Sequence, residues 1–389
     1  MHSRTGHVPE AFHIAPKLLW LRRHRPHQFQ AARYFLQPRD VVLHALTGTI
    51  ATDETHANST LLYDLRNRYW SAELFSAMEL DPAVFPQALP SGSIISEIKG
   101  SIARLTGLSA HCPVIIGGAD SQCATYGSGV TEPGAVSEMA GTSSCINTAT
   151  RFPLEDLRIS QYSHVVPGRY TTELGINTTG RAVDWALSNL GFSALDELTS
   201  AAAEVHRELR EGASGWSSPS DRAPLFMPYL GDGDRGDPHL RAGFLGLSDR
   251  HGRRELAYSV LEGIAFGVAS TLEILRDAGV PTDELRVAGG ITKVQVLGDI
   301  KADALGISVR HLPVDTALVG AALLGGSSVR GERDSFTATQ SLLAASERHD
   351  PTSRGHERLA ERFRWFRSLL DSPALRTPGT PSEQSRAAT

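Results

Sequence analysis

Asp120 follows a short apolar run and two glycines, in the segment VIIGGAD that spans residues 114–120. This order predicts a buried strand, a turn and a carboxylate at the carboxyl edge of a sheet, where α/β proteins bind their ligands. A carboxylate in that place can accept a proton from a substrate hydroxyl, or hold a metal ion. Asp120 is equally suited to cap a helix that starts at Ser121, and caps are far commoner than catalytic bases. The local pattern leaves both interpretations open.

A second candidate is the turn Gly141-Thr142-Ser143-Ser144, between two strands expected from Ala135 to Ala149. A turn that begins with glycine exposes successive backbone N–H groups, and neighbouring hydroxyls add donors, which suits phosphate oxygens. The turn is not a P-loop, because the pattern GxxxxGK[ST] is absent from the sequence. A plain β-hairpin turn explains the same residues, and such turns are common.

Gly289 and Gly290 form a third candidate, directly after a strand expected at 285–288. Paired glycines let a nucleotide base or ribose approach the backbone closely, although a tight structural turn accounts for them as well. Cys145 has no histidine partner visible in the sequence and is expected to be a small core residue. The 15 histidines show no HExxH spacing, so no metal ligand is assigned.

Helices and strands are expected to alternate around these residues, which is typical of an α/β fold. A helix is expected at 15–24, and another from Asp40, as N-cap, to Gly48. An apolar residue every fourth position predicts a long helix over 250–277, in Leu256, Val260, Ile264, Val268 and Leu272. Further expected elements are strands at 113–116 and 307–312, a helix at 294–305, and a helix of small residues that contains Gly320-Ala321-Ala322.

Composition excludes several classes of protein. At about 150 residues per domain, 389 residues favour two domains. The net charge of −5 argues against nonspecific nucleic-acid binding, and no apolar run approaches the roughly 20 residues that span a bilayer. With three cysteines, no CxxC spacing and no apolar signal region at the N-terminus, a cytoplasmic protein is expected.

Taken in chain order, segments over residues 5–330 resemble the FGGY family of carbohydrate kinases, and its xylulokinases most. Phe12 to His24 resembles the family's Lys-x-x-Trp segment, and Asp40 to Trp70 its Leu-Thr-Gly, Thr-Asp and Trp pattern. GGADSQCATYGSG resembles the segment of the catalytic aspartate, and EMAGTSSC the second phosphate loop. The most specific likeness is AGFLGLSDRHGRRELAYSVLE, from Ala242 to Glu262; Val287 to Asp303 resembles the adenosine segment, and Gly320-Ala321-Ala322 the closing Gly-Ala-Ala.

The resemblance implies a two-domain actin-like (ribonuclease H-like) fold and transfer of the γ-phosphoryl group of ATP, with Mg²⁺, to a sugar or polyol. D-xylulose is the first expected acceptor, and the expected assembly is a homodimer, with no nucleic-acid or membrane partner. Asp120 would contact the substrate and take its hydroxyl proton. The phosphates and adenosine would be bound by two groups of residues, namely Gly141, Thr142 and Ser143, and Gly289 and Gly290.

One departure concerns the first domain. The family opens with an Asp-x-Gly-Thr-[Ser/Thr] loop, its first phosphate hairpin, and no Asp-x-Gly-Thr occurs in these 389 residues. The first domain is therefore expected to be incomplete, and the alternative to an active kinase is a non-catalytic nucleotide-binding or interaction module of the same fold. Where the family shows Gly-Glu-Arg-x-Pro, this chain has Gly231 to Pro238, with Arg235 as the matching arginine.

The expected domain division follows the resemblance and the composition. Residues 1–147 are expected to be the remainder of the N-terminal sugar-binding domain, and 148–330 the C-terminal nucleotide-binding domain. A helical segment is expected at 331–372. Residues 373–389 are rich in Pro, Ser and Thr with almost no large apolar side chain, so a disordered tail is expected there.

Overall fold

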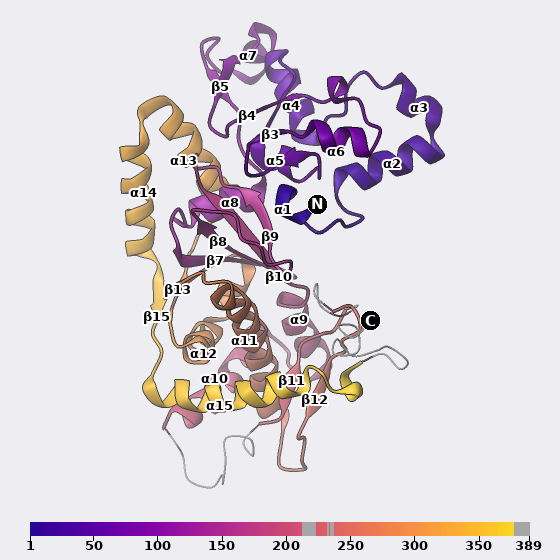
Figure 1. The fold of residues 1–389 in the computed structure, drawn as a ribbon. Helices are drawn as coiled ribbons and strands as arrows, with labels where there is room; N and C mark the ends of the chain where they lie inside the picture. Colours follow the sequence, from indigo (N-terminus) through magenta and orange to yellow (C-terminus); the bar gives the residue numbers. More distant parts are fainter. Residues whose placement is uncertain (212–222, 232, 234–236, 377–389) are drawn as a thin grey trace. The chain divides into compact units, whose positions relative to one another are not determined.

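Helices and strands alternate along most of the chain in the computed structural model, which describes residues 1–211, 223–231, 233 and 237–376 (Figure 1). By their internal contacts these residues form two compact units, each built from separate stretches of chain. Unit 1 comprises Met1–Pro133, Asn147–Glu173 and Asp315–Ala344, and unit 2 comprises Gly134–Ile146, Leu174–Val314 and Ala345–Thr389. The division predicted at residues 147 and 148 stays a prediction.

Short helices and small strand pairs make up the first stretch of unit 1. Its helices are α1 (His2–Thr5), α2 (Ile14–His24), α3 (Pro26–Ala31), α4 (Pro38–Thr47), α5 (Glu54–Asn58), α6 (Ala72–Ala77), α7 (Gly100–Thr106) and α8 (Asp120–Gly127). The strands pair as β1 (Ala51–Asp53) with β4 (Gln87–Leu89), β2 (Tyr63–Asp64) with β3 (Tyr69–Trp70), and β5 (Ile94–Glu97) with β6 (Pro113–Ile115). A core of Leu18, Leu62, Phe75 and neighbouring apolar side chains holds this stretch together.

The largest sheet in the described residues has the strand order β15-β14-β13-β7-β8-β10-β9. Its strands are β7 (Gly134–Ala140), β8 (Ser144–Thr150), β9 (Ser160–Ser163), β10 (Tyr170–Ile176), β13 (Thr282–Ala288), β14 (Ser308–His311) and β15 (Glu347–His349). Strand β13 runs parallel to both of its neighbours, β7 and β14. The carboxyl ends of these parallel strands therefore meet at one edge of the sheet, as in other α/β proteins.

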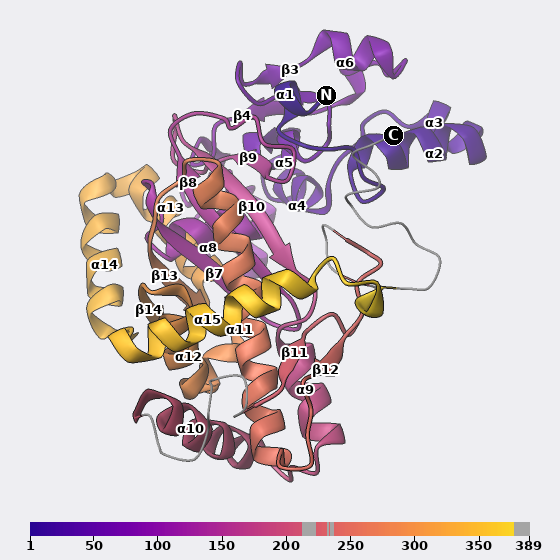
Figure 2. The same cartoon turned by 60° about the horizontal axis from the view of Figure 1, so that its bottom comes forward.

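Unit 2 also contains several helices, and the strand pair β11 (Leu225–Met227) and β12 (Gly243–Leu245) packs beside them (Figure 2). They are α9 (Gly180–Asn189), α10 (Leu195–Glu211), α11 (Arg253–Asp277), α12 (Gln295–Leu305) and α15 (Ser353–Leu369). The fully buried Arg362 of α15 donates to the Glu262 carboxylate of α11, with Nη2 2.6 Å from Oε2. This buried ion pair ties the C-terminal helix to the core.

Helix α11 confirms the expectation of a long helix from the four-residue spacing of apolar side chains. Among the described residues, α11 is the one helix that is long and apolar enough to cross a membrane. However, 83% of its most apolar 18-residue window is buried inside the protein. Burial on nearly every side explains that composition, since a helix enclosed by other elements is apolar all round.

Three expectations need correction. The second predicted helix begins at Pro38, with Gln37 as its N-cap; Asp40 lies at the third position and completes a capping box, accepting from the Gln37 amide at 3.1 Å. Proline suits the first helical position, and the N-cap therefore lies three residues upstream of the predicted one, at Gln37 instead of Asp40. The segment 331–372 contains α14 (Glu332–Ala345) and α15, but also β15 at the sheet edge.

The third correction concerns the tail predicted from residue 373. Residues 373–376 are ordered, in a short 3-10 turn over Pro373–Leu375. The Arg376 guanidinium lies 2.6 Å from the Asp237 carboxylate, and both side chains are largely buried. Residues 377–389 lie outside the described residues.

Candidate functional site

Asp120 is the first residue of α8 and is exposed. Ala119 is the N-cap of this helix, and the Asp120 carboxylate accepts a hydrogen bond from the adjacent Ser121 amide at 2.8 Å. A capping side chain would instead accept from an amide two or three residues ahead. The capping interpretation is therefore wrong, and the Asp120 carboxylate faces solvent at the start of the helix.

The backbone before Asp120 is held by a side chain from a distant segment. The Ala119 amide donates to the Thr55 hydroxyl at 2.7 Å, across 64 positions of sequence. Gly118 packs closely against another distant residue, since a Cβ there would lie 2.6 Å from a Val165 methyl carbon. The position of Asp120 is thus set by α5 as well as by its own strand and helix.

Asp53 anchors Thr55 in turn. Its fully buried carboxylate accepts from the Thr55 amide at 2.8 Å and from Nδ1 of His56 at 2.7 Å. It also accepts from the Thr55 hydroxyl and pairs with the Arg39 guanidinium. Burial alone would raise the pKa of Asp53, but the bonds and charges of His56, Arg39 and Thr55 together lower it. An ionised Asp53 therefore fixes the segment that supports Asp120.

Helix α8, which begins with Asp120, packs within unit 1 against α13 (Thr316–Arg330), and the two helices lie side by side in Figures 1 and 2. A Cβ on Gly320 would lie 1.8 Å from the Cys123 carbonyl oxygen, and one on Gly127 would lie 2.0 Å from the Thr316 carbonyl oxygen. Both positions must therefore be glycine for the two backbones to approach this closely. The Gly-Ala-Ala segment thus has a direct structural role, because its Gly320 lets α13 pack closely against the helix that carries Asp120.

In unit 2 the turn 141–143 joins β7 to β8, and its residues are exposed. Ser144, predicted as part of this turn, is buried and belongs to β8. The start of α9 holds the turn by its carbonyls: the Gly180 amide donates to Gly141 at 2.9 Å, and the Arg181 amide to Thr142 at 3.2 Å. The side chains of Thr142 and Ser143 are thereby left at the surface.

Gly289 and Gly290 lie beside this turn, because β13 and β7 are neighbours and Ala288 pairs with Met139. Gly289 has φ of 100°, and a Cβ there would lie 2.5 Å from the Ala140 carbonyl oxygen. Gly290 is exposed, and a Cβ there would meet no atom within 4 Å. The structure therefore brings both predicted groups of glycine-containing residues to one edge of the sheet, within unit 2.

A buried ion pair stiffens this edge. The Lys301 ammonium of α12 lies 2.6 Å from the Glu138 carboxylate of β7, and both side chains are fully buried. The other oxygen of Glu138 accepts from the Ser144 hydroxyl at 2.8 Å, which in turn lies 2.7 Å from the Thr179 hydroxyl. The network joins β7, β8, α9 and α12 directly beneath the turn.

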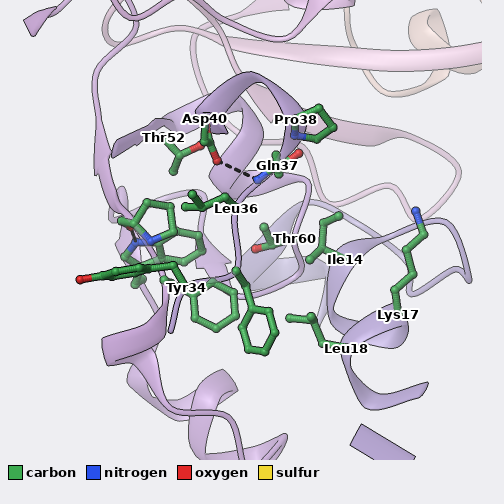
Figure 3. Close-up of a pocket in the computed structure, with 14 residues that line it drawn as sticks. Ile14, Lys17, Leu18, Tyr34, Leu36, Gln37, Pro38, Asp40, Thr52 and Thr60 are labelled. Carbon is green, nitrogen blue, oxygen red and sulfur yellow. Dashed lines mark hydrogen bonds between the residues drawn. The ribbon is translucent and has the colours of Figure 1, made fainter. Parts of the chain in front are cut away.

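A pocket of about 310 Å³ lies in unit 1 beside α2 (Figure 3). Its lining is mostly apolar and includes Leu18, Tyr34 and Trp70, with Lys17 as a charged residue. Asp40 also lines it, but its carboxylate is engaged with Gln37 in the capping box drawn as the dashed line in Figure 3. Burial raises the pKa of Asp40. No pattern in the sequence predicts this pocket, and Asp120 is not among the residues that line it.

Sequence reasoning missed the residues that support the candidate site. Asp53 and Thr55 carried a weak signal, an Asp after a short strand and before a helix. Glu138 and Lys301 carried another, since each is a charged residue within an otherwise largely apolar element. Arg235, suggested as the counterpart of a family arginine, lies outside the described residues.

Solved sugar kinases share this fold. The solved xylulose kinase from Rhodospirillum rubrum superposes with a TM-score of 0.84 at 26% identity, over 95% of this chain and 73% of that one. The chain is also 26% identical over 351 residues to a xylulose kinase of Staphylococcus epidermidis, covering 88% of this chain and 68% of the relative. It is 30% identical over 339 residues to a glycerol kinase of Gloeobacter violaceus, covering 84% and 64%.

Residues 1–127 match the N-terminal domain of the FGGY family of carbohydrate kinases, and residues 136–329 match its C-terminal domain. The chain therefore belongs to the FGGY family of carbohydrate kinases. The predicted two-domain FGGY sugar-kinase fold and the likeness to xylulose kinases are confirmed. This chain spans between 64% and 73% of the lengths of the three proteins named above.

Proposed function

We propose that this chain takes part in transfer of the γ-phosphoryl group of ATP to a hydroxyl of a small sugar, with D-xylulose as the first candidate. Two of the three similar proteins named above are xylulose kinases, and the third is a glycerol kinase. A polyol is therefore the nearest competing acceptor. Small acceptors and ATP are soluble metabolites, so we expect the protein to act in the cytoplasm.

The observation that carries the proposal is the bare backbone at Gly289 and Gly290, next to the turn 141–143. Gly290 leaves open space where a side chain would stand, and the turn is held by its carbonyls from behind. Such a surface fits a nucleotide: the glycines would lie against adenosine, and Gly141, Thr142 and Ser143 would donate to phosphate oxygens. Mg²⁺ supplied with ATP would neutralise phosphate charge.

We propose that Asp120 accepts the proton of the sugar hydroxyl. Its carboxylate is exposed, free of a capping role, and held through Ala119, Thr55 and Asp53. Transfer of a phosphoryl group depends on positioning and charge stabilisation more than on covalent help. A base on a rigidly held backbone meets the first of these needs.

The opposite side of the phosphate clamp in this family is an Asp-x-Gly-Thr loop, and these 389 residues contain no such sequence. We infer that this polypeptide by itself binds ATP but transfers the phosphoryl group slowly, and that a segment carrying the loop restores the rate. Contacts to adenosine survive the loss of the loop, whereas contacts that form in the transition state do not.

Titration with ATP and Mg²⁺ tests the nucleotide site. Gly290→Val places a side chain where ATP would lie without disturbing the protein, so ATP affinity should fall at least about tenfold, by steric exclusion of about 1.4 kcal/mol or more. Gly326→Val in α13, which also faces open space, is the matched control and should leave affinity unchanged. Wild-type ATP affinity in a folded Gly290→Val protein would contradict the proposed site.

A panel of acceptors tests the substrate. D-xylulose, other ketopentoses, glycerol and hexonates are each incubated with Mg-ATP, and ADP release is followed with the missing loop segment supplied by fusion. D-xylulose should give the highest kcat/KM. Preference for glycerol would move the assignment to a polyol, and ATP binding without turnover on any acceptor would favour the non-catalytic module.

A further inference from the structure

Three metal-ligating side chains gather at an edge of the large sheet in unit 2, away from the nucleotide residues in sequence. His311 ends β14, and Glu347 and His349 belong to β15. The antiparallel register pairs His311 with Glu347 and Val309 with His349, so all three side chains project from one face of the strand pair. One potential ligand atom from each lies within 4.8 Å of the other two.

The two imidazoles hold nitrogen atoms with unused hydrogen-bonding capacity. Within the described part of the chain, the buried Nδ1 of His311 and the buried Nε2 of His349 have no hydrogen-bond partner. The two rings lie with their centroids 4.5 Å apart. Buried polar atoms are nearly always satisfied, so a pair of unsatisfied nitrogens side by side calls for a partner that the protein does not supply.

The surroundings of His349 resemble the outer shell of a metal site. Its Nδ1 lies 3.2 Å from the Asp299 carboxylate, which accepts a hydrogen bond from the Nδ1–H group. In this tautomer Nε2 is the ring nitrogen with a free lone pair. A Cβ on Gly298 would lie 2.5, 2.5 and 2.7 Å from Cδ2, Nε2 and Cγ of this ring. Near-equal distances to three ring atoms place Gly298 over the ring face, so it does not block the lone pair, which points outward in the ring plane.

Glu347 completes the cluster from β15, opposite His311 in the strand register. The carboxylate of Glu347 is 52% exposed and lies 4.0 Å from Nε2 of His349. Since bonds to zinc are about 2.0–2.2 Å long, ligand atoms in a tetrahedral site lie roughly 3.4 Å apart. A rotation of the exposed Glu347 side chain suffices to bring its oxygen closer.

We propose that His311, His349 and Glu347 bind one divalent transition-metal ion of the zinc class, with Asp299 as a positioning residue. Two imidazoles and one carboxylate select zinc, cobalt or nickel over magnesium and calcium, which prefer oxygen ligands. Three protein ligands leave a fourth position for water. The ion would link β15 to β14 and so fix the edge strand that leads into α15.

Metal titration of the untagged full chain tests this assignment, with ZnCl₂ by calorimetry and CoCl₂ by visible absorption. The wild type should bind one equivalent of Zn²⁺, Co²⁺ should give the intense visible bands of a tetrahedral site, and excess Mg²⁺ should not compete. Saturating Zn²⁺ should raise the thermal midpoint by about 2–4 °C or more.

The variants separate ligands from structural residues. His349→Ala should abolish the tetrahedral cobalt spectrum. Glu347→Gln should lower the affinity for Zn²⁺ at least tenfold, and because the position is exposed the fold should stay intact. Asp299→Asn should cost about 10- to 100-fold in affinity, as expected for an outer-shell carboxylate. His27→Ala, at an exposed histidine of α3, is the control and should bind as the wild type does.

Two results would overturn the proposal: absence of saturable zinc binding to the wild type, or zinc affinity unchanged in folded Glu347→Gln and His349→Ala proteins. Neither readout requires kinase activity, so failure here leaves the proposed function untouched.

Discussion

His164 illustrates how a single buried side chain depends on its protonation state. Its Nε2 donates to the Val130 carbonyl at 3.0 Å, and its Nδ1 accepts from the Val166 amide at 2.8 Å. A protonated imidazole has no lone pair, so protonation would break the bond to Val166. Burial, opposed by the bond to Val130, lowers the pKa of His164 to about 4.

Acid should therefore destabilise the protein through His164. The unfolded ring titrates near 6.5 and the folded ring near 4, so the unfolded state binds more protons in this window. The free energy of unfolding of the protein must then fall as the pH drops from about 6.5 to 4, by up to about 3 kcal/mol. Urea unfolding at pH 7.5 and pH 4.5 should show a smaller fall for His164→Gln than for the wild type.

His27→Ala, at an exposed histidine of α3, is the control for this measurement and should show the same fall as the wild type. His7 and His311 also have lowered pKa values and contribute to the wild-type slope, so the comparison rests on the difference between wild type and variant. Equal pH dependence in wild type and His164→Gln would show that His164 does not carry this effect.

At the scale of elements, the packing of α8, the helix that begins with Asp120, against α13 depends on two glycines. Helix α13 reaches α8 through Gly320, whose α-carbon lies against the Cys123 carbonyl of α8. Both contacting groups are backbone, so neither can rotate away from an added methyl group. The separation of the two helices is therefore fixed by the absence of a side chain at Gly320 and at Gly127.

Gly320→Ala should force α13 away from α8 and lower the free energy of unfolding by about 1–3 kcal/mol or more, as overpacking does. Gly326→Ala lies in the same helix with no atom within 4 Å of its Cβ, and should instead stabilise by about 0.5–1 kcal/mol through helix propensity. Urea unfolding of both variants is the measurement. A Gly320→Ala protein as stable as Gly326→Ala would mean that the crossing is looser than described.

Elements with a strong local pattern could be predicted from the sequence. The spacing of apolar residues gave the long helix α11, and short apolar runs followed by glycines gave β6 and β13. The start of α4 was misplaced because two signals compete there, Asp40 as a cap and Pro38 as a first helical residue. Strand β15 is three residues long and gains its place by pairing with β14, which no local pattern reveals.

At the scale of the whole molecule, the missed residues share one property, which is contact over a long stretch of sequence. Thr55 supports Ala119 across 64 positions, and Lys301 reaches Glu138 across 163. The two histidines of the proposed metal site likewise come from separate strands, β14 and β15, and meet only when these strands pair. The glycine turns could be found because their chemistry is local, whereas their supports exist only once the chain has folded.

Phosphoryl transfer also depends on the whole molecule, because groups from several segments, including the family's Asp-x-Gly-Thr loop, must act as a unit. The Asp120 carboxylate and the turns at 141–143 and 289–290 are in the chain, and that loop sequence is not. A fusion that places the leading segment of the Staphylococcus epidermidis xylulose kinase before residue 1 supplies it. ATP titration of the fusion and of the chain alone provides the reference affinities.

Sugar-dependent ADP release by this fusion bears most directly on the proposed chemistry, with Asp120→Asn compared against the unsubstituted fusion and against Asp196→Asn, an exposed aspartate in α10. If Asp120 accepts the hydroxyl proton, Asp120→Asn lowers kcat by about 100- to 10,000-fold while ATP affinity stays near its reference value. Asp196→Asn should turn over normally. An Asp120→Asn fusion that releases ADP at the unsubstituted rate would show that Asp120 is not the base.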